Sequence, residues 1–233
     1  MLLALETSAE RGSVALFDGE RLLGEVWLDA RERHAASLLV CLDKLLGETG
    51  RTLEAVDRIA LAIGPGSFTG LRIGLATALG LAFGTERTLV PVPTLAALAT
   101  QTGVSGLVAP LLDARRGEIY GGLYRADGRE VVADSCSGIR EFLARLPQNE
   151  TIAFVGGGVS AHRGEIAARL GERARFLPLE AGVLCAASVG RLGLRLAAGG
   201  HALAPERVEL RYLRRAEAEA KRLALHPTGE PIP

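Results

Sequence analysis

The chain contains one arrangement of expected elements twice, and this repeat constrains the fold more than any single motif. In residues 2–84 three strand patterns precede a helical pattern, a fourth strand, a glycine-rich break and a second helix. Residues 107–170 follow the same order after a polar, glycine-bearing run at 101–106. A length of 233 residues suits one large domain or two small ones. The repeat therefore predicts two small lobes built on one plan.

Both copies open with a hairpin pattern. In the first, an apolar strand ends at Glu6, and Asp18-Gly19 separates two further strands, which is a strong hairpin signal. In the second, the apolar strand ends at Asp113 and the turn is Asp127-Gly128. The expected elements are strands at 2–7, 13–17, 21–28 and 58–63 with helices at 33–48 and 69–84, then strands at 107–112, 118–124, 130–133 and 151–155 with helices at 138–146 and 160–170.

The rest of the chain adds one apolar helix and a charged end. Residues 183–198 have a helical pattern that Gly199 and Gly200 terminate. The expected division is an N-terminal lobe at 1–104, a C-terminal lobe at 105–182, a segment of about 183–215 that can pack back on the first lobe, and a flexible tail at 216–233.

Two lobes that each combine a hairpin-led sheet with helices describe the α/β fold of actin, hexokinase and the heat-shock ATPases, the ASKHA or ribonuclease H-like class. There, an acid at the strand end holds a metal or water, and glycines let backbone N–H groups approach phosphate oxygens. This chain has Glu6-Thr7-Ser8 and Asp113-Ala114-Arg115 where those ATPases usually have Asp-x-Gly. We therefore interpret the hairpins as lacking a working nucleotide site and expect no cofactor, with a vestigial nucleotide site as the alternative.

The most specific segment is a strand-to-helix turn that reads Gly64-Pro65-Gly66-Ser67-Phe68-Thr69-Gly70-Leu71-Arg72-Ile73-Gly74. Its first glycines free the backbone, Pro65 stiffens it, and Ser67 or Thr69 can cap the following helix. Such a turn could bind an anion at the helix N-terminus. It is not a Walker loop, since no Gly-Lys-Ser/Thr follows, and it lacks the third glycine of a dinucleotide fingerprint.

Small residues recur along the helix after this turn. Gly70, Gly74 and Ala78 are spaced by four and therefore lie on one face. A glycine inside a helix costs about 1 kcal/mol relative to alanine, so several of them need an offsetting gain such as close approach of another backbone. Tight packing within the same lobe and a helix–helix interface with another subunit both remain open. The interface explanation predicts that Gly74→Leu weakens association and leaves the monomer folded.

Six segments carry a resemblance to a known family. They are Leu3–Ser8, Ser13–Leu16, Arg31–His34, Gly64–Gly74, Asp113–Tyr120 and Tyr212–Arg214. Together they resemble the TsaB (YeaZ) family, the dimerisation subunits of the bacterial tRNA threonylcarbamoyladenosine machinery. The similarity covers about residues 1–215, with the Gly64–Gly74 motif as its most specific part, and residues 216–233 lie outside the family pattern.

The resemblance implies a heterodimer with the catalytic paralogue TsaD. That enzyme transfers a threonylcarbamoyl group from its adenylate to N6 of adenosine 37 in tRNAs that read codons beginning with A. The ATPase TsaE joins the assembly, isolated members often form homodimers through the same surface, and contact with tRNA is indirect. In the family the first two helices form the interface, and the matching positions here are Leu38, Leu42, Gly70, Leu71, Gly74, Ala78 and Leu81. The residues of the family signature loop are Gly64, Pro65, Gly66, Ser67, Phe68, Thr69 and Arg72.

The residue patterns of known catalytic sites are missing from the chain. The catalytic paralogue carries a metal on an HxxxH pair, which places two imidazoles one turn apart, but here His34 is followed four residues later by Leu38. The sequence contains no Gly-x-Ser-x-Gly elbow and no Ser-x-x-Lys motif. We therefore expect a non-catalytic subunit without catalytic or metal-binding residues. The alternative is a small phosphotransferase related to the sugar and acetate kinases, with its own ATP site.

The amino-acid composition limits which partners the protein can bind and where in the cell it can work. Twenty-seven basic residues balance 27 acidic ones, which argues against an extended basic face that holds nucleic acid alone. The three cysteines are far apart and suit a reducing compartment. The longest uncharged apolar run, residues 73–85, is shorter than the roughly 20 residues of a membrane span, and the N-terminus lacks a secretory leader pattern. We therefore expect no membrane contact and a cytoplasmic protein.

Overall fold

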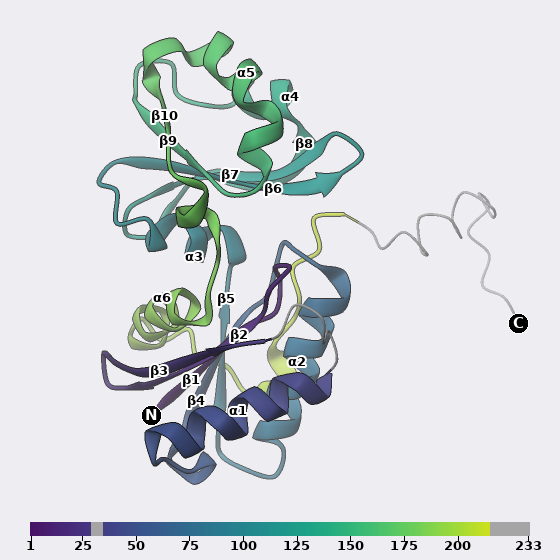
Figure 1. Ribbon diagram of the computed structural model, residues 1–233, viewed down its shortest axis with the longest axis vertical. Helices are drawn as coiled ribbons and strands as arrows, with labels where there is room; N and C mark the ends of the chain where they lie inside the picture. The colour runs from purple at the N-terminus through teal and green to yellow at the C-terminus, as the bar shows by residue number, and fades with distance from the viewer. Residues whose placement is uncertain (29–34, 215–233) are drawn as a thin grey trace, which may run out of the picture.

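The computed structural model describes residues 1–28 and 35–214 and divides into two lobes, one above the other in Figure 1. Each lobe is built on a five-stranded mixed sheet. The strand order is β3-β2-β1-β4-β5 in the first sheet and, in the corresponding direction, β8-β7-β6-β9-β10 in the second. The two orders match strand for strand, which confirms the duplication and the α/β fold class expected from the sequence.

The first lobe contains more elements than its sequence pattern predicted. They are β1 (Leu2–Glu6), β2 (Ser13–Asp18), β3 (Arg21–Trp27), α1 (Ala35–Thr49), β4 (Arg58–Ala62), α2 (Phe68–Ala82), β5 (Thr88–Val92) and α3 (Thr94–Gln101). The expected elements are present within about two residues, although the predicted start of the first helix at residue 33 lies outside the described residues. The sequence reading missed β5 and α3. Pro91 makes the sequence of β5 look unlike a strand, because proline is rare inside strands. Nevertheless β5 pairs in parallel with β4 and completes the sheet.

The second lobe follows the same plan with a longer third strand. Its elements are β6 (Leu107–Arg115), β7 (Glu118–Arg125), β8 (Glu130–Gly138), α4 (Ile139–Ala144), β9 (Ile152–Val155), α5 (Gly158–Leu170) and β10 (Ala174–Phe176), followed by α6 (Ala186–Ala198). The strand predicted to end at residue 133 continues to Gly138, and three-residue β10 was missed. The last helix begins three residues later than predicted, because the backbone is extended at Val183 and at the N-cap Cys185.

Helices cover both faces of each sheet. Figure 1 shows α1 and α2 on the outer face of the first sheet, α4 and α5 on the outer face of the second, and α3 and α6 between the two sheets. A buried cluster lies on each outer face, one around Leu38 and Leu61 and one around Phe142 and Ile166. A third cluster runs from the first sheet through α6 and α3 into the second sheet. None of the described helices is both long and apolar enough to cross a membrane.

After α6 the chain returns to the first lobe. Leu203 and Leu89 exchange two backbone hydrogen bonds, of 2.8 and 2.9 Å, which add a short bridge beside β5. A 3₁₀ turn at Pro205–Arg207 follows, and Val208 is buried against the outer cluster of the first lobe. Residues 209–214 then cross toward the second lobe, as the yellow end of the ribbon in Figure 1 shows.

Candidate partner-binding site

The turn after β4 joins three parts of the chain. Gly64 has a φ of +116°, its N–H donates to Thr94 Oγ1 (3.1 Å), and its carbonyl accepts from the Thr94 N–H (3.0 Å). A side chain at Gly64 would collide with the backbone carbonyl of Arg211. Glycine is therefore required here both by the positive φ and by close approach of the C-terminal segment.

The same turn also packs against the first hairpin. The Ser67 N–H donates to the Ser8 carbonyl (2.8 Å), and a Cβ on Gly66 would lie 2.6 Å from that oxygen. Ser67 caps α2, because its Oγ accepts from the Gly70 N–H (3.2 Å), whereas Thr69 is exposed and makes no such cap. The N–H groups of Ser67 and Gly70 are thus bonded within the chain. The motif therefore joins the start of α2 to the first hairpin.

The acid at the end of β1 is committed to its own turn. Glu6 is fully buried, and its Oε1 accepts from the Ser8 N–H (2.6 Å), the Ser8 hydroxyl (2.6 Å) and the Ala9 N–H (2.9 Å). Its Oε2 has no hydrogen-bond partner in the described part of the chain. Burial raises the pKa of Glu6 to about 7 against the opposing effect of these hydrogen bonds. Glu6 therefore stabilises the hairpin turn through Oε1 and does not present a fully free carboxylate to a ligand.

The glycines of α2 are explained by packing within the lobe. Side chains at Gly70 and Gly74 would collide with the carbonyl oxygen and the hydroxyl of Thr7, respectively. Of the two explanations that the sequence left open, tight packing inside one lobe holds for both positions. A leucine at Gly74 would require Thr7 to move, so the expectation that Gly74→Leu leaves the monomer folded stays a prediction that this contact opposes.

Most of the predicted interface side chains lie in the core of the first lobe. Leu38, Leu42, Leu71 and Ala78 are at most 5% exposed, and Leu81 is partly buried against the same cluster. Because these side chains already fill the monomer core, they have little surface left for a partner, and their place in an interface stays a prediction. Helical periodicity identifies the stripe that faces the sheet, and these residues are that stripe.

A different set of apolar side chains on the same two helices faces outward. Leu39 and Val40 on α1 are 49% and 67% exposed. Leu79 on α2 and Phe83 at its C-cap are 37% and 88% exposed. Leu79 and Phe83 are four residues apart and so lie on one side of α2. We call these four residues the α1–α2 patch; the signal that could have found them is apolar character outside the buried stripe.

The exposed side of α2 begins with an ordered arginine. The Arg72 guanidinium lies 4.0 Å from the centroid of the Phe68 ring, and its Nε donates to the Tyr212 hydroxyl (3.3 Å). The rings of Phe68 and Tyr212 are themselves 5.1 Å apart. Two members of the signature loop, Phe68 and Arg72, therefore hold the C-terminal segment against the start of α2.

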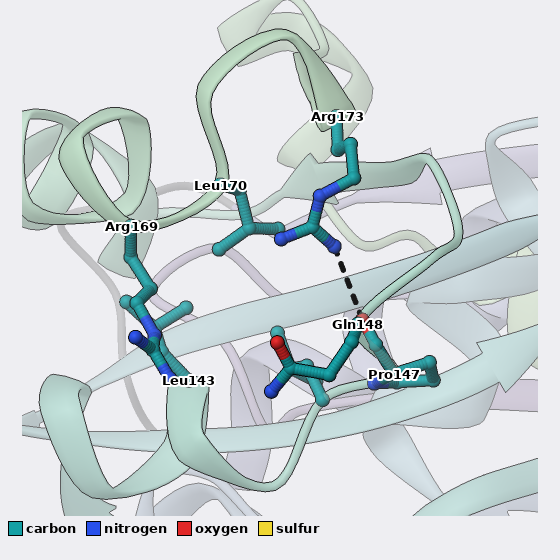
Figure 2. A pocket seen from close by; sticks show the side chains of 7 residues that line it. Leu143, Pro147, Gln148, Arg169, Leu170 and Arg173 are labelled. Carbon is teal, nitrogen blue, oxygen red and sulfur yellow. Dashed lines mark hydrogen bonds between the residues drawn. The ribbon is translucent and has the colours of Figure 1, made fainter.

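Two hollows lie in the second lobe. One of about 300 Å³ lies beside the Gly156 turn, where Ser160 and Arg163 line it with apolar residues. The other, in Figure 2, lies between the ends of α4 and α5, where Arg173 donates to the Pro147 carbonyl (3.2 Å). With about 10 Å³, the second has room for about one water molecule. The larger hollow is where a vestigial nucleotide site would have space.

His34, which stands alone where a catalytic paralogue would begin an HxxxH pair, lies outside the described residues. His162 contacts Glu165 (Nδ1 to Oε1, 3.6 Å), and His201 contacts the Leu196 carbonyl (3.2 Å). Within residues 1–28 and 35–214, no three His, Cys, Asp or Glu side chains converge as metal ligands would.

Two sheets of matching order, hairpins at the strand ends and helices between the lobes define a protein of the two-lobed actin, hexokinase and heat-shock ATPase class. The family model described as TsaD, tRNA N6-adenosine threonylcarbamoyltransferase, matches residues 24–220. A tRNA threonylcarbamoyladenosine biosynthesis protein TsaB of Bacillus subtilis is 30% identical over 226 residues, which are 94% of this chain and 96% of the relative. The chain belongs to the TsaB family.

Two further comparisons agree with this membership. The structure of YeaZ from Pseudomonas aeruginosa is 31% identical, with a TM-score of 0.77 over 91% of this chain and 99% of that one. A tRNA N6-adenosine threonylcarbamoyltransferase of Streptococcus sanguinis is 32% identical over 128 residues, 48% of this chain and 38% of the relative. The similarity thus extends, over a shorter stretch, to the enzyme for which the family model is named.

Proposed function

We propose that this chain is a non-catalytic subunit that binds the threonylcarbamoyltransferase TsaD and activates it. Membership of the TsaB family supports a role in tRNA threonylcarbamoyladenosine biosynthesis. The observation that carries the subunit role is the α1–α2 patch, which exposes four apolar side chains on two adjacent helices.

Burial of this patch would favour association. A fully buried leucine, valine or phenylalanine contributes about 1.5–3 kcal/mol relative to an exposed one. Aromatic side chains near the centre of an interface often dominate its energy, and Phe83 is the most exposed member of the patch. Because TsaD relatives share sequence with this chain, we propose that TsaD presents its equivalent two helices to α1 and α2.

Other partners follow from the same proposal. A homodimer through the α1–α2 patch would form when TsaD is absent, since both partners would present the same kind of surface. TsaE would join the assembly, and tRNA would be contacted mainly by TsaD. Equal numbers of basic and acidic residues fit an indirect role toward RNA. A protein that assists tRNA modification would work in the cytoplasm.

The non-catalytic role is supported by the first hairpin. The Glu6 Oε1 accepts three hydrogen bonds from Ser8 and Ala9, so the carboxylate serves its own turn. The Ser67 and Gly70 N–H groups of the signature loop are bonded inside the chain as well. In an ATPase of this class the first hairpin is the part that faces the phosphates, and here its acid is bonded to its own turn.

The test is reconstitution of threonylcarbamoyl transfer to tRNA with purified TsaD, TsaE and this chain. We expect co-elution of the chain with TsaD in size-exclusion chromatography and transfer only when the chain is present. Separate elution peaks in the presence of TsaE and tRNA would contradict the proposal. Tight binding of ATP by the isolated chain in calorimetry, with phosphate transfer to a sugar or to acetate, would instead support the phosphotransferase alternative.

A further inference from the structure

The lobes are connected at two separate places. On one side, α3 and α6 lie between the two sheets and share one apolar cluster. On the other side, the segment Glu209–Arg214 crosses from the first lobe to the second, as Figure 1 shows. We call this segment the strap. The strap contacts the first lobe through its backbone and an aromatic ring, and it contacts the second lobe through arginine side chains.

The strap is fixed to the first lobe through its backbone and one ring. The Arg211 N–H donates to the Ile63 carbonyl at the end of β4 (2.8 Å). The Tyr212 ring packs on Phe68, and its hydroxyl accepts from Arg72. Both anchors lie at the turn that leads into α2, so the strap is attached where the signature loop already joins β4 to the first hairpin.

Two arginine side chains fix the strap to the second lobe. Arg211 forms ion pairs with Asp134 (Nη1 to Oδ2, 3.1 Å) and with Glu130 (Nη2 to Oε2, 3.7 Å) on β8. Arg214 reaches the turn between β6 and β7, where its Nη1 donates to the Ala114 carbonyl (2.9 Å) and its Nη2 pairs with Glu118 (3.1 Å).

The ion pair between Arg211 and Asp134 differs from a surface pair because Asp134 is buried. The Asp134 side chain is fully buried and also accepts a hydrogen bond from the Tyr124 hydroxyl. Loss of Arg211 would leave a buried carboxylate without its counter-charge, and such a loss is far costlier than loss of an exposed pair. Exposed pairs contribute little, so Arg211 is the principal fastening and Arg214 the second.

We propose that the strap fastens the two lobes in one relative orientation and prevents them from opening and closing about α3 and α6. A single connection would act as a hinge, but Arg211 and Arg214 hold different strands of the second sheet, so rotation about either contact is opposed by the other. Hinge closure around a ligand needs a connection that can absorb such rotation. The strap also gives the Tyr212–Arg214 motif a role, which is to join the lobes.

The test is a distance measurement between the lobes by pulsed electron paramagnetic resonance. Spin labels are placed at Glu54→Cys and Glu172→Cys, which are exposed sites in the first and second lobes, after Cys41, Cys136 and Cys185 are replaced by serine. The strap variant combines Arg211→Gln and Asp134→Asn, so that no buried charge is orphaned, with Arg214→Ala. The control is Arg207→Ala, an exposed arginine just before the strap.

We expect one narrow distance distribution in the parent and in the Arg207→Ala control. In the strap variant we expect a distribution at least twice as broad. An equally narrow distribution in a strap variant that retains its circular dichroism spectrum would overturn the proposal. If the strap variant does not fold, Arg214→Ala alone is measured, and an unchanged width in that variant would overturn the two-point fastening.

Discussion

The outer helix layers of the two lobes occupy equivalent positions but have opposite surfaces. In the first lobe, α1 and α2 expose Leu39, Val40, Leu79 and Phe83. In the second, α4 and α5 are linked across their exposed sides by Arg140 Nε and Glu165 Oε2 (2.8 Å), with His162 beside them. The outer layer of the first lobe thus exposes large apolar side chains, although α1 also carries an exposed Lys44–Glu48 pair, and the outer layer of the second carries the Arg140–Glu165 pair. The difference is why we propose the α1–α2 layer, rather than the α4–α5 layer, as the surface that binds a partner.

The strand ends that begin the two hairpins differ as well. Glu6 is buried and holds its own turn with three hydrogen bonds. Asp113, its counterpart, is exposed, and its Oδ1 accepts from the Arg115 N–H (2.7 Å). Glu6 and Asp113 therefore do not form a pair of carboxylates that face one shared ligand. The two acids thus occupy corresponding positions in different environments.

The largest effect is expected from the helix that carries the signature loop. Alanine at Gly70 would collide with the Thr7 backbone, which is rigid, so we expect Gly70→Ala to lower the free energy of unfolding by about 3–4 kcal/mol. At Gly164 on α5, the equivalent helix, a Cβ meets nothing within 4 Å. Gly164→Ala should therefore stabilise the protein by up to about 1 kcal/mol. Urea unfolding of both variants measures this contrast, and similar shifts would refute it.

The pH dependence of stability should separate the two acids. The folded-state pKa of Glu6 is about 7, above its ordinary value of 4.5, so the folded state keeps this proton longer than the unfolded state. The contribution of the Glu6 proton to the free energy of unfolding is fully present below pH 4.5 and is lost as pH rises through 7. It amounts to about 3 kcal/mol. We expect Glu6→Gln to flatten the stability profile between pH 5 and 8 in urea unfolding.

Asp113→Asn is the matched control, because Asp113 is exposed and caps only its own turn. That substitution should leave the slope between pH 5 and 8 as it is in the parent. A slope that persists in Glu6→Gln would mean that another group carries the pH dependence. Asp134 is the next candidate, since burial raises its pKa to about 6.

Charge in the α1–α2 patch should weaken association with TsaD. We expect Phe83→Asp to lower the affinity about 100-fold, or about 2.7 kcal/mol, because a carboxylate would be buried where a ring packs. The control is Val131→Asp on β8, which places the same charge at a residue 41% exposed in the second lobe. Calorimetry should show no change for that control. Equal losses for both variants would remove the distinction between the lobes.

The smallest effect is expected at Gly80, on the exposed side of α2. A Cβ there meets nothing within 4 Å, so Gly80→Ala should stabilise the monomer by about 0.5–1 kcal/mol. The added methyl group should also lower the affinity for TsaD a few-fold if the partner helix approaches closely at this glycine. Unfolding and calorimetry on the same variant measure both quantities. Higher stability with unchanged affinity would show that Gly80 has no role in the interface.

Much of the fold could be predicted because the local signals agree. Hairpin turns, glycine breaks and helical periodicity predicted the repeated order of elements that the two sheets confirm. The missed strands depend on tertiary pairing instead. β5 contains Pro91 and is a strand because it lies beside β4, and β10 has three residues paired with β9. Such pairings carry little signal in the local sequence.

The proposed interface rests on the sequence for the choice of helices and on the structure for the choice of side chains. The family resemblance pointed to the first two helices, whereas apolar periodicity selected Leu38, Leu42 and Leu71, which form the core. Spacing alone could not separate a glycine that meets Thr7, as Gly70 does, from one in open space, as Gly80 is. That distinction depends on a neighbour more than 60 residues away in the sequence. Only the packed structure supplies it.

Hydrogen–deuterium exchange of this chain, alone and with TsaD, tests the central claim most directly. The proposed assembly predicts slower exchange in peptides from Ala35–Thr49 and Phe68–Ala82, because α1 and α2 become covered. It predicts unchanged exchange in Ile139–Ala144 and Gly158–Leu170, the charged counterparts. Protection of the second pair of helices with none in the first would contradict the account.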